Sequence, residues 1–474
     1  MLTKPVDLNL SQTHKSKLTL ALLGMGLTCL VVLFSIPETK AWMNGHGFVF
    51  TSIEDFQKSL SGKADASKRT DKVKPKALDT ALTRKLNAAV KLRVDSIKSK
   101  NHFLDNNINE QKVKPLDAFF QALLGMGDSA VRIWYYGDSQ IEGDRISQDL
   151  RTLLQGKFGG NGQGLVPLSD IAGYRNVTLK TGPGWIRHTV FSNRKSSDFG
   201  FSGVKFFTSY QDSNFNPYAQ IFISNNIKYD RLYLLHGKSN GDKLTLTTAS
   251  GKKSFEIPKS NLGGRLYLGK AEYGNVTLNG AGGGTILYGY MLESNRGIQI
   301  DNCGIRGHSG DGLFLISDGM LKMQAKMLNT KLCILHYGNN AIPYIKNEKV
   351  AEYVGNELKR LFVKFRNALP GVSILVVSGG DMGRTIDGVP QSYPYAGLLA
   401  EKIGVAAAEA GCAFFDMHSL MAKDGGIVGW TQKGWAGLDG HLSPAGQMQF
   451  AKTLYQELMG EYEVYQLLNQ NRNQ

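Results

Sequence analysis

Residues 131–139 read VRIWYYGDS, a short apolar run that ends in glycine, aspartate and serine. The run is rich in β-branched and aromatic residues, which is typical of a buried strand. The chain that follows carries apolar residues with helical spacing until Gly159-Gly160, at Ile146, Leu150, Leu153, Leu154 and Phe158. The sequence therefore predicts a strand over 131–136, a turn at Gly137-Asp138-Ser139 and a helix after it.

The same alternation of strand and helix returns near the end of the chain. Apolar runs predict strands over 332–336, 372–378 and 412–416, and helical spacing predicts helices over 350–365 and 396–410. A last helix is expected to begin at Ser443-Pro444, because serine is a preferred N-cap and proline is favoured at the first helical position. This alternation predicts an α/β fold with a mainly parallel sheet that helices cover on both faces.

Residues 171–296 show a different pattern. Clusters of Gly, Asn, Ser and Asp separate short apolar or alternating runs, which lie at 204–208, 219–223, 231–235, 243–248, 265–268, 275–278 and 285–292. Short strands at close spacing predict an all-β sandwich or jelly roll. We therefore expect an α/β domain over 116–170 and 297–470 that is interrupted by an inserted β domain over 171–296.

The N-terminus carries an export signal. Three lysines precede Leu18–Pro37, a run of 20 residues without charge, and as a helix it would rise about 30 Å, enough to cross a bilayer once. Positive charge before the run directs the remainder of the chain out of the cytoplasm. Thr39-Lys40-Ala41 resembles a signal cleavage site. Residues 1–41 are thus a cleaved signal peptide or an uncleaved anchor, and both alternatives place the remainder in the periplasm or cell envelope.

Residues 42–115 are interpreted as a basic spacer, helical around 82–97 and otherwise loose. Residues 1–115 carry 19 Lys/Arg against 10 Asp/Glu, so they hold +9 of the net charge of +15. A basic extension beside a membrane or an anionic wall fits this distribution. The folded part shows no pattern of a nucleic-acid-binding motif, so we expect no nucleic-acid partner, and contact with the membrane only through the N-terminal segment.

Cysteine usage excludes two further classes of protein. Four cysteines in 474 residues are too few for a disulfide scaffold. Cys303, Cys333 and Cys412 are widely separated and lack the spacing of a zinc site. We interpret them as buried, small apolar side chains.

The Gly137-Asp138-Ser139 turn is the first candidate for chemistry. A serine between a strand and the following helix lies at the carboxyl edge of a parallel sheet, where its hydroxyl is open to a substrate. The same tripeptide occurs at Gly127-Asp128-Ser129. That copy precedes the strand and belongs at the opposite edge, so position selects Ser139.

Three more polar groups are expected near predicted strand ends or before a helix. Gly307 ends the stretch NCGIRG after a short apolar run, Asn340 follows the strand over 332–336, and His441 lies with Asp439 in the loop before the last helix. Acyl transfer needs a serine nucleophile, a histidine base oriented by a carboxylate, and donors to an oxyanion. Each of these roles has a candidate.

This order of residues resembles the SGNH (GDSL-type) hydrolase superfamily, whose four sequence blocks contribute Ser, Gly, Asn and His. The resemblance implies a three-layer α/β/α fold with Ser139 as nucleophile, His441 as base and Asp439 as its orienting carboxylate. It implies an oxyanion hole formed by the N–H groups of Ser139 and Gly307 and the side-chain amide of Asn340. It implies no metal and no organic cofactor.

The stretches GDSQIEGDRISQDLR, FGGNGQGLVP and IDNCGIRG resemble one exported branch of that superfamily, the peptidoglycan O-acetylesterases, which carry a β-sandwich, carbohydrate-binding-like insert. The resemblance implies a serine esterase that removes O-acetyl groups from a polysaccharide, with peptidoglycan favoured. Two alternatives remain open. The same serine would also serve an O-acetyltransferase that passes the acetyl group to a sugar, and a non-catalytic glycan-binding envelope protein would need no such chemistry.

The sequence departs from the family pattern at two positions. Ala341 follows Asn340 where the family usually has Asp, and Leu438 occupies the position three before His441 where the family places its carboxylate. Asp439 is only two before His441. Either the loop is one residue tighter, or Asp439 orients the imidazole imperfectly and the site works nearer a Ser–His dyad.

Other candidates have structural interpretations. His308, His336 and His418 lie near predicted strand ends and are expected to be structural, with His308 the one best placed to touch a substrate. Four aromatic residues of the inserted domain would stack on sugar rings if exposed, but a place in the β core is favoured for them: Trp185, Tyr210, Tyr218 and Tyr229.

Overall fold

The computed structural model describes residues 80–106, 113–170, 172–208, 217–280 and 284–472. The predicted signal or anchor over 1–41, with its membrane segment at 18–37, lies outside the described residues. Within the described ranges, no helix is both long enough and apolar enough to span a membrane. The chain from Ala81 onward forms one unit, which is described below.

The central sheet has six strands, in the order β1–β19–β16–β15–β2–β14. Their bounds are β1 Leu104–Asp105, β2 Ala130–Gly137, β14 Gly297–Gly304, β15 Thr330–His336, β16 Ser373–Val377 and β19 Ala413–Phe415. Every neighbouring pair is parallel except β1, which runs antiparallel to β19. The predicted mainly parallel sheet and the strands over 131–136, 332–336, 372–378 and 412–416 are confirmed.

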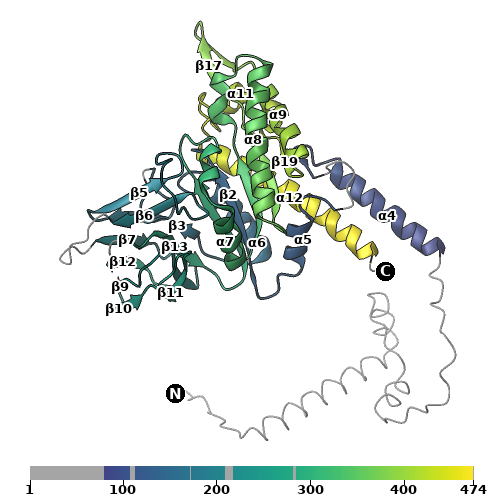
Figure 1. Cartoon of the computed structure of the whole chain (residues 1–474). Helices are drawn as coiled ribbons and strands as arrows, with labels where there is room; N and C mark the ends of the chain where they lie inside the picture. The colour runs from purple at the N-terminus through teal and green to yellow at the C-terminus, as the bar shows by residue number, and fades with distance from the viewer. Residues whose placement is uncertain (1–79, 107–112, 171, 209–216, 281–283, 473–474) are drawn as a thin grey trace, which may run out of the picture. The chain divides into compact units, whose positions relative to one another are not determined.

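Helices cover both faces of this sheet (Figure 1). Side chains alternate along a strand, so Trp134 and Tyr136 of β2 pack on one face, and Ile133 and Tyr135 on the other. The first face is covered by α7 (Asp318–Leu328), α8 (Glu348–Ala368) and α9 (Ala396–Glu409), and the second by α5 (Asp117–Leu124), α6 (Arg145–Phe158) and α12 (Pro444–Arg472). Burial on both faces explains why the strands read as continuous apolar runs.

The predicted helices after Ser139, over 350–365 and 396–410, and from Ser443-Pro444 are confirmed by α6, α8, α9 and α12. Short elements at the ends of the sheet had no periodicity by which to predict them. These are β17 (Gly383–Ile386), β18 (Val389–Ser392), α10 (Met417–Lys423), α11 (Gly426–Gln432) and the 3-10 helices η1 (Asp311–Leu315) and η2 (Asn339–Tyr344).

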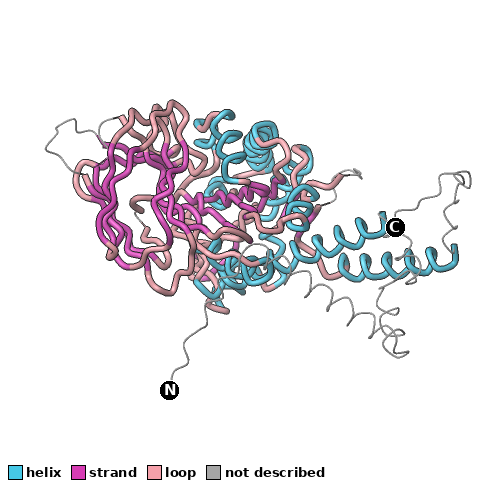
Figure 2. Tube along the Cα trace, turned by 90° about the horizontal axis from the view of Figure 1, so that it is seen from below, coloured by secondary structure: helices cyan, strands magenta, loops and turns pink. Residues whose placement is uncertain are grey.

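Residues 164–293 contribute two antiparallel sheets. One has the order β10–β9–β12–β7–β4, and the other β11–β8–β13–β6–β5, with β3 paired to β13. The bounds are β3 Gly164–Val166, β4 Val177–Thr181, β5 Trp185–Thr189, β6 Val204–Thr208, β7 Tyr218–Ile223, β8 Arg231–His236, β9 Lys243–Thr248, β10 Gly251–Glu256, β11 Gly264–Lys270, β12 Gly274–Gly280 and β13 Leu287–Glu293. All seven predicted strands of this region are present. Figure 2 shows the antiparallel strands gathered on the left, away from most helices.

The two antiparallel sheets share one apolar core with the first face of the parallel sheet. The Tyr290 hydroxyl in β13 donates to the carbonyl of Ala219 in β7, which ties the two sheets together at 2.8 Å. Trp185 donates to the carbonyl of Tyr218 at 2.9 Å, and Tyr229 is buried. Tyr229 therefore belongs to the core and Trp185 packs against it, as favoured from the sequence. Tyr218 is half-buried and lies outside that core cluster, and Tyr210 lies outside the described residues.

The end of the expected spacer is fixed to the sheet. The predicted helix around 82–97 is present as α4 (Thr80–Lys98), and β1 follows it and pairs with β19. The Glu457 carboxylate of α12 accepts hydrogen bonds from the backbone N–H groups of His102, Phe103 and Leu104, the last at 2.6 Å. The sequence predicted loose chain here because a strand of two residues has no periodicity.

Candidate active site

The carboxyl ends of β14, β2 and β15 lie side by side and carry three of the predicted site residues. Gly304 of β14 and His336 of β15 are both register partners of Gly137 in β2. The chain therefore leaves all three strands at one edge, toward Gly307, Ser139 and Asn340. In doubly wound sheets, ligands bind at this edge, next to the strand that has later strands added on both of its sides. Here that strand is β2.

The second Gly-Asp-Ser lies at the other end of β2, as predicted. Ser129 donates its backbone N–H to the carbonyl of Met126 at 2.9 Å, in a turn between α5 and β2. Its position before the strand places it away from the edge that carries Ser139.

The structure brings Ser139, His441 and Asp439 together, although Ser139 and His441 are 302 positions apart. Ser139 Oγ lies 2.8 Å from His441 Nε2, and His441 Nδ1 lies 2.9 Å from Asp439 Oδ2. The hydroxyl, the two ring nitrogens and the carboxylate thus form one continuous hydrogen-bonded chain. In this order the carboxylate orients the ring and the ring can accept the serine proton.

A tight turn explains how Asp439 reaches His441 from only two positions away. Gly437 donates to the His441 carbonyl, and Gly440 donates to the Gly437 carbonyl, both at 2.9 Å. Gly440 has φ +84, a left-handed conformation that favours glycine. Asp439 Oδ1 also accepts the backbone N–H of His441 at 3.2 Å. The turn therefore brings the Asp439 carboxylate within hydrogen-bond distance of His441 Nδ1, which is the geometry that the first of the two alternatives above requires.

Gln140 holds the histidine loop against the serine turn, a role that was not predicted from the sequence. Its buried side chain donates from Nε2 to the Gly440 carbonyl at 2.7 Å and accepts from the Leu442 N–H at 3.3 Å. The two bonds flank His441. Its position directly after Ser139 was the only signal in the sequence, because the partner loop is 300 residues away.

Asp138 and Asn340 form a second contact beside the serine. Asn340 Nδ2 donates to Asp138 Oδ2 at 3.0 Å and to the His308 carbonyl at 3.2 Å. His308 directly follows Gly307, so the predicted oxyanion donors Gly307 and Asn340 belong to neighbouring turns. Both N–H groups of the Asn340 amide are engaged here, so an oxyanion role requires one of these bonds to be exchanged. Burial raises the pKa of Asp138 to about 6.

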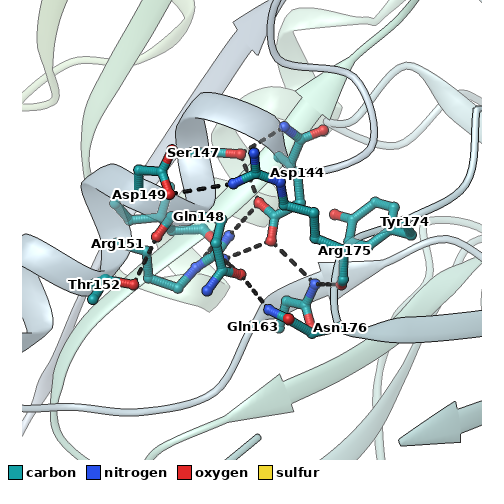
Figure 3. Close-up of polar contacts among 12 residues, drawn as sticks. Asp144, Ser147, Gln148, Asp149, Arg151, Thr152, Gln163, Tyr174, Arg175 and Asn176 are labelled. Carbon is teal, nitrogen blue, oxygen red and sulfur yellow. Dashed lines mark hydrogen bonds and ion pairs between the residues drawn. The ribbon is translucent and has the colours of Figure 1, made fainter. Parts of the chain in front are cut away.

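The buried ion pair between Asp144 and Arg151 supports the serine turn (Figure 3). Asp144, at φ +64, accepts two hydrogen bonds from Arg151, at 2.7 and 2.8 Å, and one from Ser147 at 2.6 Å. Asn302 of β14 donates to Ser147 Oγ at 2.7 Å and to the Ile141 carbonyl at 2.6 Å. The turn that carries Ser139 is thus bonded both to α6 and to the neighbouring strand, which fixes the nucleophile before a substrate arrives.

The buried histidines and cysteines are structural, as the sequence predicted. His308 is fully buried and accepts the Gly312 N–H on Nε2 at 3.0 Å, so it does not face a substrate. Cys303, Cys333 and Cys412 are free and buried, and burial raises the pKa of each thiol, that of Cys412 to about 12. Among the residues that the structure describes, no three or more His, Cys, Asp or Glu side chains form a cluster that could hold a metal ion.

Protonation of the buried histidines is expected to destabilise the fold in acid. Burial lowers the pKa of His336 to about 3 and that of His308 to about 4, from the ordinary value of 6.5. At a pH between the lowered pKa of each histidine and its ordinary value of 6.5, the unfolded chain binds a proton that the folded chain does not. The free energy of unfolding therefore falls as the pH decreases, by ~1.4 kcal/mol per pH unit for each such histidine.

In His336→Gln, the free energy of unfolding is expected to change less steeply with pH between about pH 4.5 and 6. The slope should fall by about 1.4 kcal/mol per pH unit, the contribution of one proton. Urea unfolding at several pH values measures this slope. His102→Gln makes the same substitution on the surface and is the matched control, with the wild-type slope expected. Asp138 acts in the opposite sense because its pKa is raised, but it is present in both variants. A wild-type slope in His336→Gln would contradict a buried, neutral His336.

Comparison with solved structures supports the fold. A structure described as a "Peptidoglycan O-acetylesterase in action" matches with a TM-score of 0.60 and 20% identity, over 76% of this chain and 99% of that chain. Family two carbohydrate esterases from Cellvibrio japonicus and Clostridium thermocellum match at 11% and 10% identity with TM-scores of 0.25 and 0.24, over 62% and 59% of this chain and 99% and 100% of theirs. The likeness of fold is therefore argued from the first structure alone, because its TM-score is the high one of the three.

No protein-family model matches the chain, and no curated protein sequence matches it. The element order, the parallel sheet and the added antiparallel sheets agree with the resemblance that the sequence predicted. The chain therefore has the fold of a solved peptidoglycan O-acetylesterase, and the predicted resemblance is confirmed at the level of the fold.

Proposed function

We propose that this chain is an exported serine esterase that removes O-acetyl groups from a cell-envelope polysaccharide, with peptidoglycan as the substrate. The observation that carries the proposal is the contact of Ser139 Oγ with His441 Nε2 at 2.8 Å, with Asp439 bonded to the other ring nitrogen. Acyl transfer through a serine requires this order of groups. The fold shared with a peptidoglycan O-acetylesterase and the predicted export signal suggest the polymer.

In the proposed reaction, His441 Nε2 accepts the Ser139 proton as Oγ attacks the acetyl carbonyl carbon. The imidazolium then gives that proton to the sugar oxygen as the ester C–O bond breaks, which leaves acetyl-Ser139 and a free sugar hydroxyl. Water attacks the acetyl group with His441 again as base, and acetate leaves with Ser139 restored. The N–H groups of Ser139 and Gly307 and the Asn340 amide are the proposed donors to the oxyanion.

The exposure of the site suits a polymeric substrate. The side chains of His441 and Asp439 are 48% and 67% exposed, so the base is open to solvent. A glycan strand can reach such a site at any point along its length. An esterase for long acyl chains would instead surround its substrate with apolar side chains.

The substrate class is tested by acetate release from O-acetylated peptidoglycan with the full-length protein. The same peptidoglycan after mild base treatment, which removes O-acetyl but not N-acetyl groups, is the matched control. We expect acetate from the first substrate and none from the second. Acetate from acetylated xylan with none from peptidoglycan would assign a different polymer, and no release from either would overturn the proposal.

An added oligosaccharide acceptor separates hydrolysis from transfer. The proposal predicts that free acetate exceeds acetyl groups transferred to the acceptor, because water has open access to the exposed His441. Transfer in excess of hydrolysis would make the chain an O-acetyltransferase with the same nucleophile.

A further inference from the structure

Arg306 lies beside the proposed oxyanion donor and is anchored by a buried carboxylate. It directly precedes Gly307 in the turn after β14, and its Nε donates to Glu142 Oε2 at 2.8 Å. Glu142 follows Ser139 by three positions. The Glu142 side chain is 2% exposed, whereas the Arg306 side chain is 55% exposed. The buried Glu142 carboxylate thus binds the Nε edge of the Arg306 guanidinium, while much of the Arg306 side chain is exposed to solvent.

The free edge of this guanidinium has the geometry of an anion receptor. A guanidinium has five N–H groups, and Arg306 uses its Nε–H on Glu142. Within the described ranges, its two terminal nitrogens have no hydrogen-bond partner. Two parallel N–H groups in one plane match a carboxylate, and a guanidinium that is already fixed loses little freedom on binding.

A second arginine lies near Glu142. Arg187 of β5 is half-buried, and its charge interacts with Asp170 and Glu142. Its Nε has no hydrogen-bond partner in the part of the chain that the structure describes. Glu142 therefore interacts with two guanidinium groups, those of Arg306 and Arg187.

An apolar ring borders the same turn. Phe191, in the loop between β5 and β6, lies so close that a Cβ added to Gly307 would be 3.6 Å from its ring. Phe191 is 42% exposed. The turn at Gly307 thus has an aromatic ring within contact distance and a guanidinium on the preceding residue, a combination that suits a sugar ring with an acidic substituent.

We propose that Arg306, held by Glu142, selects O-acetylated sugars that carry a carboxylate by binding that carboxylate while Ser139 receives the acetyl group. The inference rests on the proposed function and narrows its substrate class to acidic glycans. In peptidoglycan chemistry the carboxylate has two sources, the lactyl group of a muramic acid without peptide or the side chains and end of an attached peptide.

Matched substrate pairs test this inference with the full-length protein. The first pair is an O-acetylated muramic acid methyl glycoside and its lactyl amide, and the second is an O-acetylated muramyl dipeptide and its diamide. The readout is the ratio of kcat/KM between acid and amide, measured by acetate release. We expect the wild type to prefer one acid about tenfold, the effect of one charge-assisted hydrogen-bond pair. The preferred pair identifies the source of the carboxylate.

Arg306→Gln is expected to reduce that ratio to about 1, and Arg306→Lys, which keeps the charge but not the paired N–H groups, to retain part of it. Arg194→Gln is the matched control, because Arg194 is also 55% exposed and pairs with Asp311 at 2.5 Å. It should keep the wild-type ratio. If Arg306→Gln does not fold, Arg306→Lys decides by its ratio.

Three results would overturn the inference. These are a wild type without preference in both pairs, a wild-type ratio in both Arg306 variants, and an equal loss in Arg194→Gln, which would show general electrostatic attraction. Acetate from no probe at all would overturn the proposed function, and this inference would fall with it. Acetate release without acid preference would overturn the inference alone.

Discussion

Ser139→Ala and His441→Ala are each expected to lower kcat/KM for acetate release on the order of 10⁴-fold or more. Without the hydroxyl no acetyl-enzyme forms, and without the imidazole no group removes the Ser139 proton. The two groups act as a unit through their 2.8 Å contact. The double variant should therefore be no slower than either single variant, measured on O-acetylated peptidoglycan, and additive losses would contradict a shared step.

Asp439→Asn separates a triad from a dyad. The carboxylate bonds His441 Nδ1 at 2.9 Å, but its side chain is 67% exposed, so water screens its charge. We expect a loss of about 10- to 100-fold, the size of one hydrogen bond to a charged group. No loss would identify a Ser–His dyad, and a loss as large as that of Ser139→Ala would contradict the expected screening.

Arg132→Met is expected to lower the free energy of unfolding by about 3–5 kcal/mol. Arg132 in β2 donates to Asp301 Oδ1 in β14 at 2.7 Å, to Glu293 in β13 and to the Leu328 carbonyl at 3.3 Å. All three charged side chains are buried. Removal of the guanidinium leaves Asp301 without its ion-pair partner in the region where the parallel sheet meets the antiparallel strands. Urea unfolding at neutral pH measures the loss.

Two further variants test this explanation. Arg360→Met removes an arginine that is 67% exposed and pairs with Glu357 on the surface, and it should leave stability nearly unchanged. Asp301→Asn added to Arg132→Met removes the stranded charge and should recover part of the loss. Equal effects of Arg132→Met and Arg360→Met would contradict a buried ion pair that supports the fold.

The α/β part could be predicted because its strands are buried on both faces and its helices are amphipathic, so each leaves a periodic or continuous apolar pattern. The turn at Ser139 was recognisable from its position after β2. In the antiparallel sheets, the sequence did not predict strands β3, β4, β5 and β10. In β10 the residues GKKSFE are mostly exposed, so no alternation marks the strand. Strand β1 forms only because Glu457 and β19 hold its backbone.

The candidate site likewise contains residues that the sequence predicts and residues that it does not predict. The five residues expected there are distinguished by residue type and by place at strand ends or in one loop: Ser139, Gly307, Asn340, Asp439 and His441. The structure places the first three at one sheet edge and joins Ser139, His441 and Asp439 by hydrogen bonds. Their roles in a reaction stay predictions.

Residues that support or extend the site were not predictable. Gln140 acts on a loop 300 positions away, the Arg306–Glu142 pair spans 164 positions, and Phe191 reaches Gly307 from the antiparallel region. Local sequence carries no record of such distant partners. The turn around Gly440 likewise allows Asp439 to contact His441 from two positions away through its backbone conformation. The family pattern, with its carboxylate three positions before the histidine, does not predict this contact.

Ser139 is the proposed nucleophile, and labelling with a fluorophosphonate tests this assignment in the unmodified protein. The reagent reacts with an activated serine and does not turn over, so the result does not depend on a variant folding. We predict one label per chain, on the peptide that contains Ser139, and loss of acetate release in proportion to labelling. Full labelling with acetate release intact, or a label on another residue that accompanies the loss, would contradict the assignment.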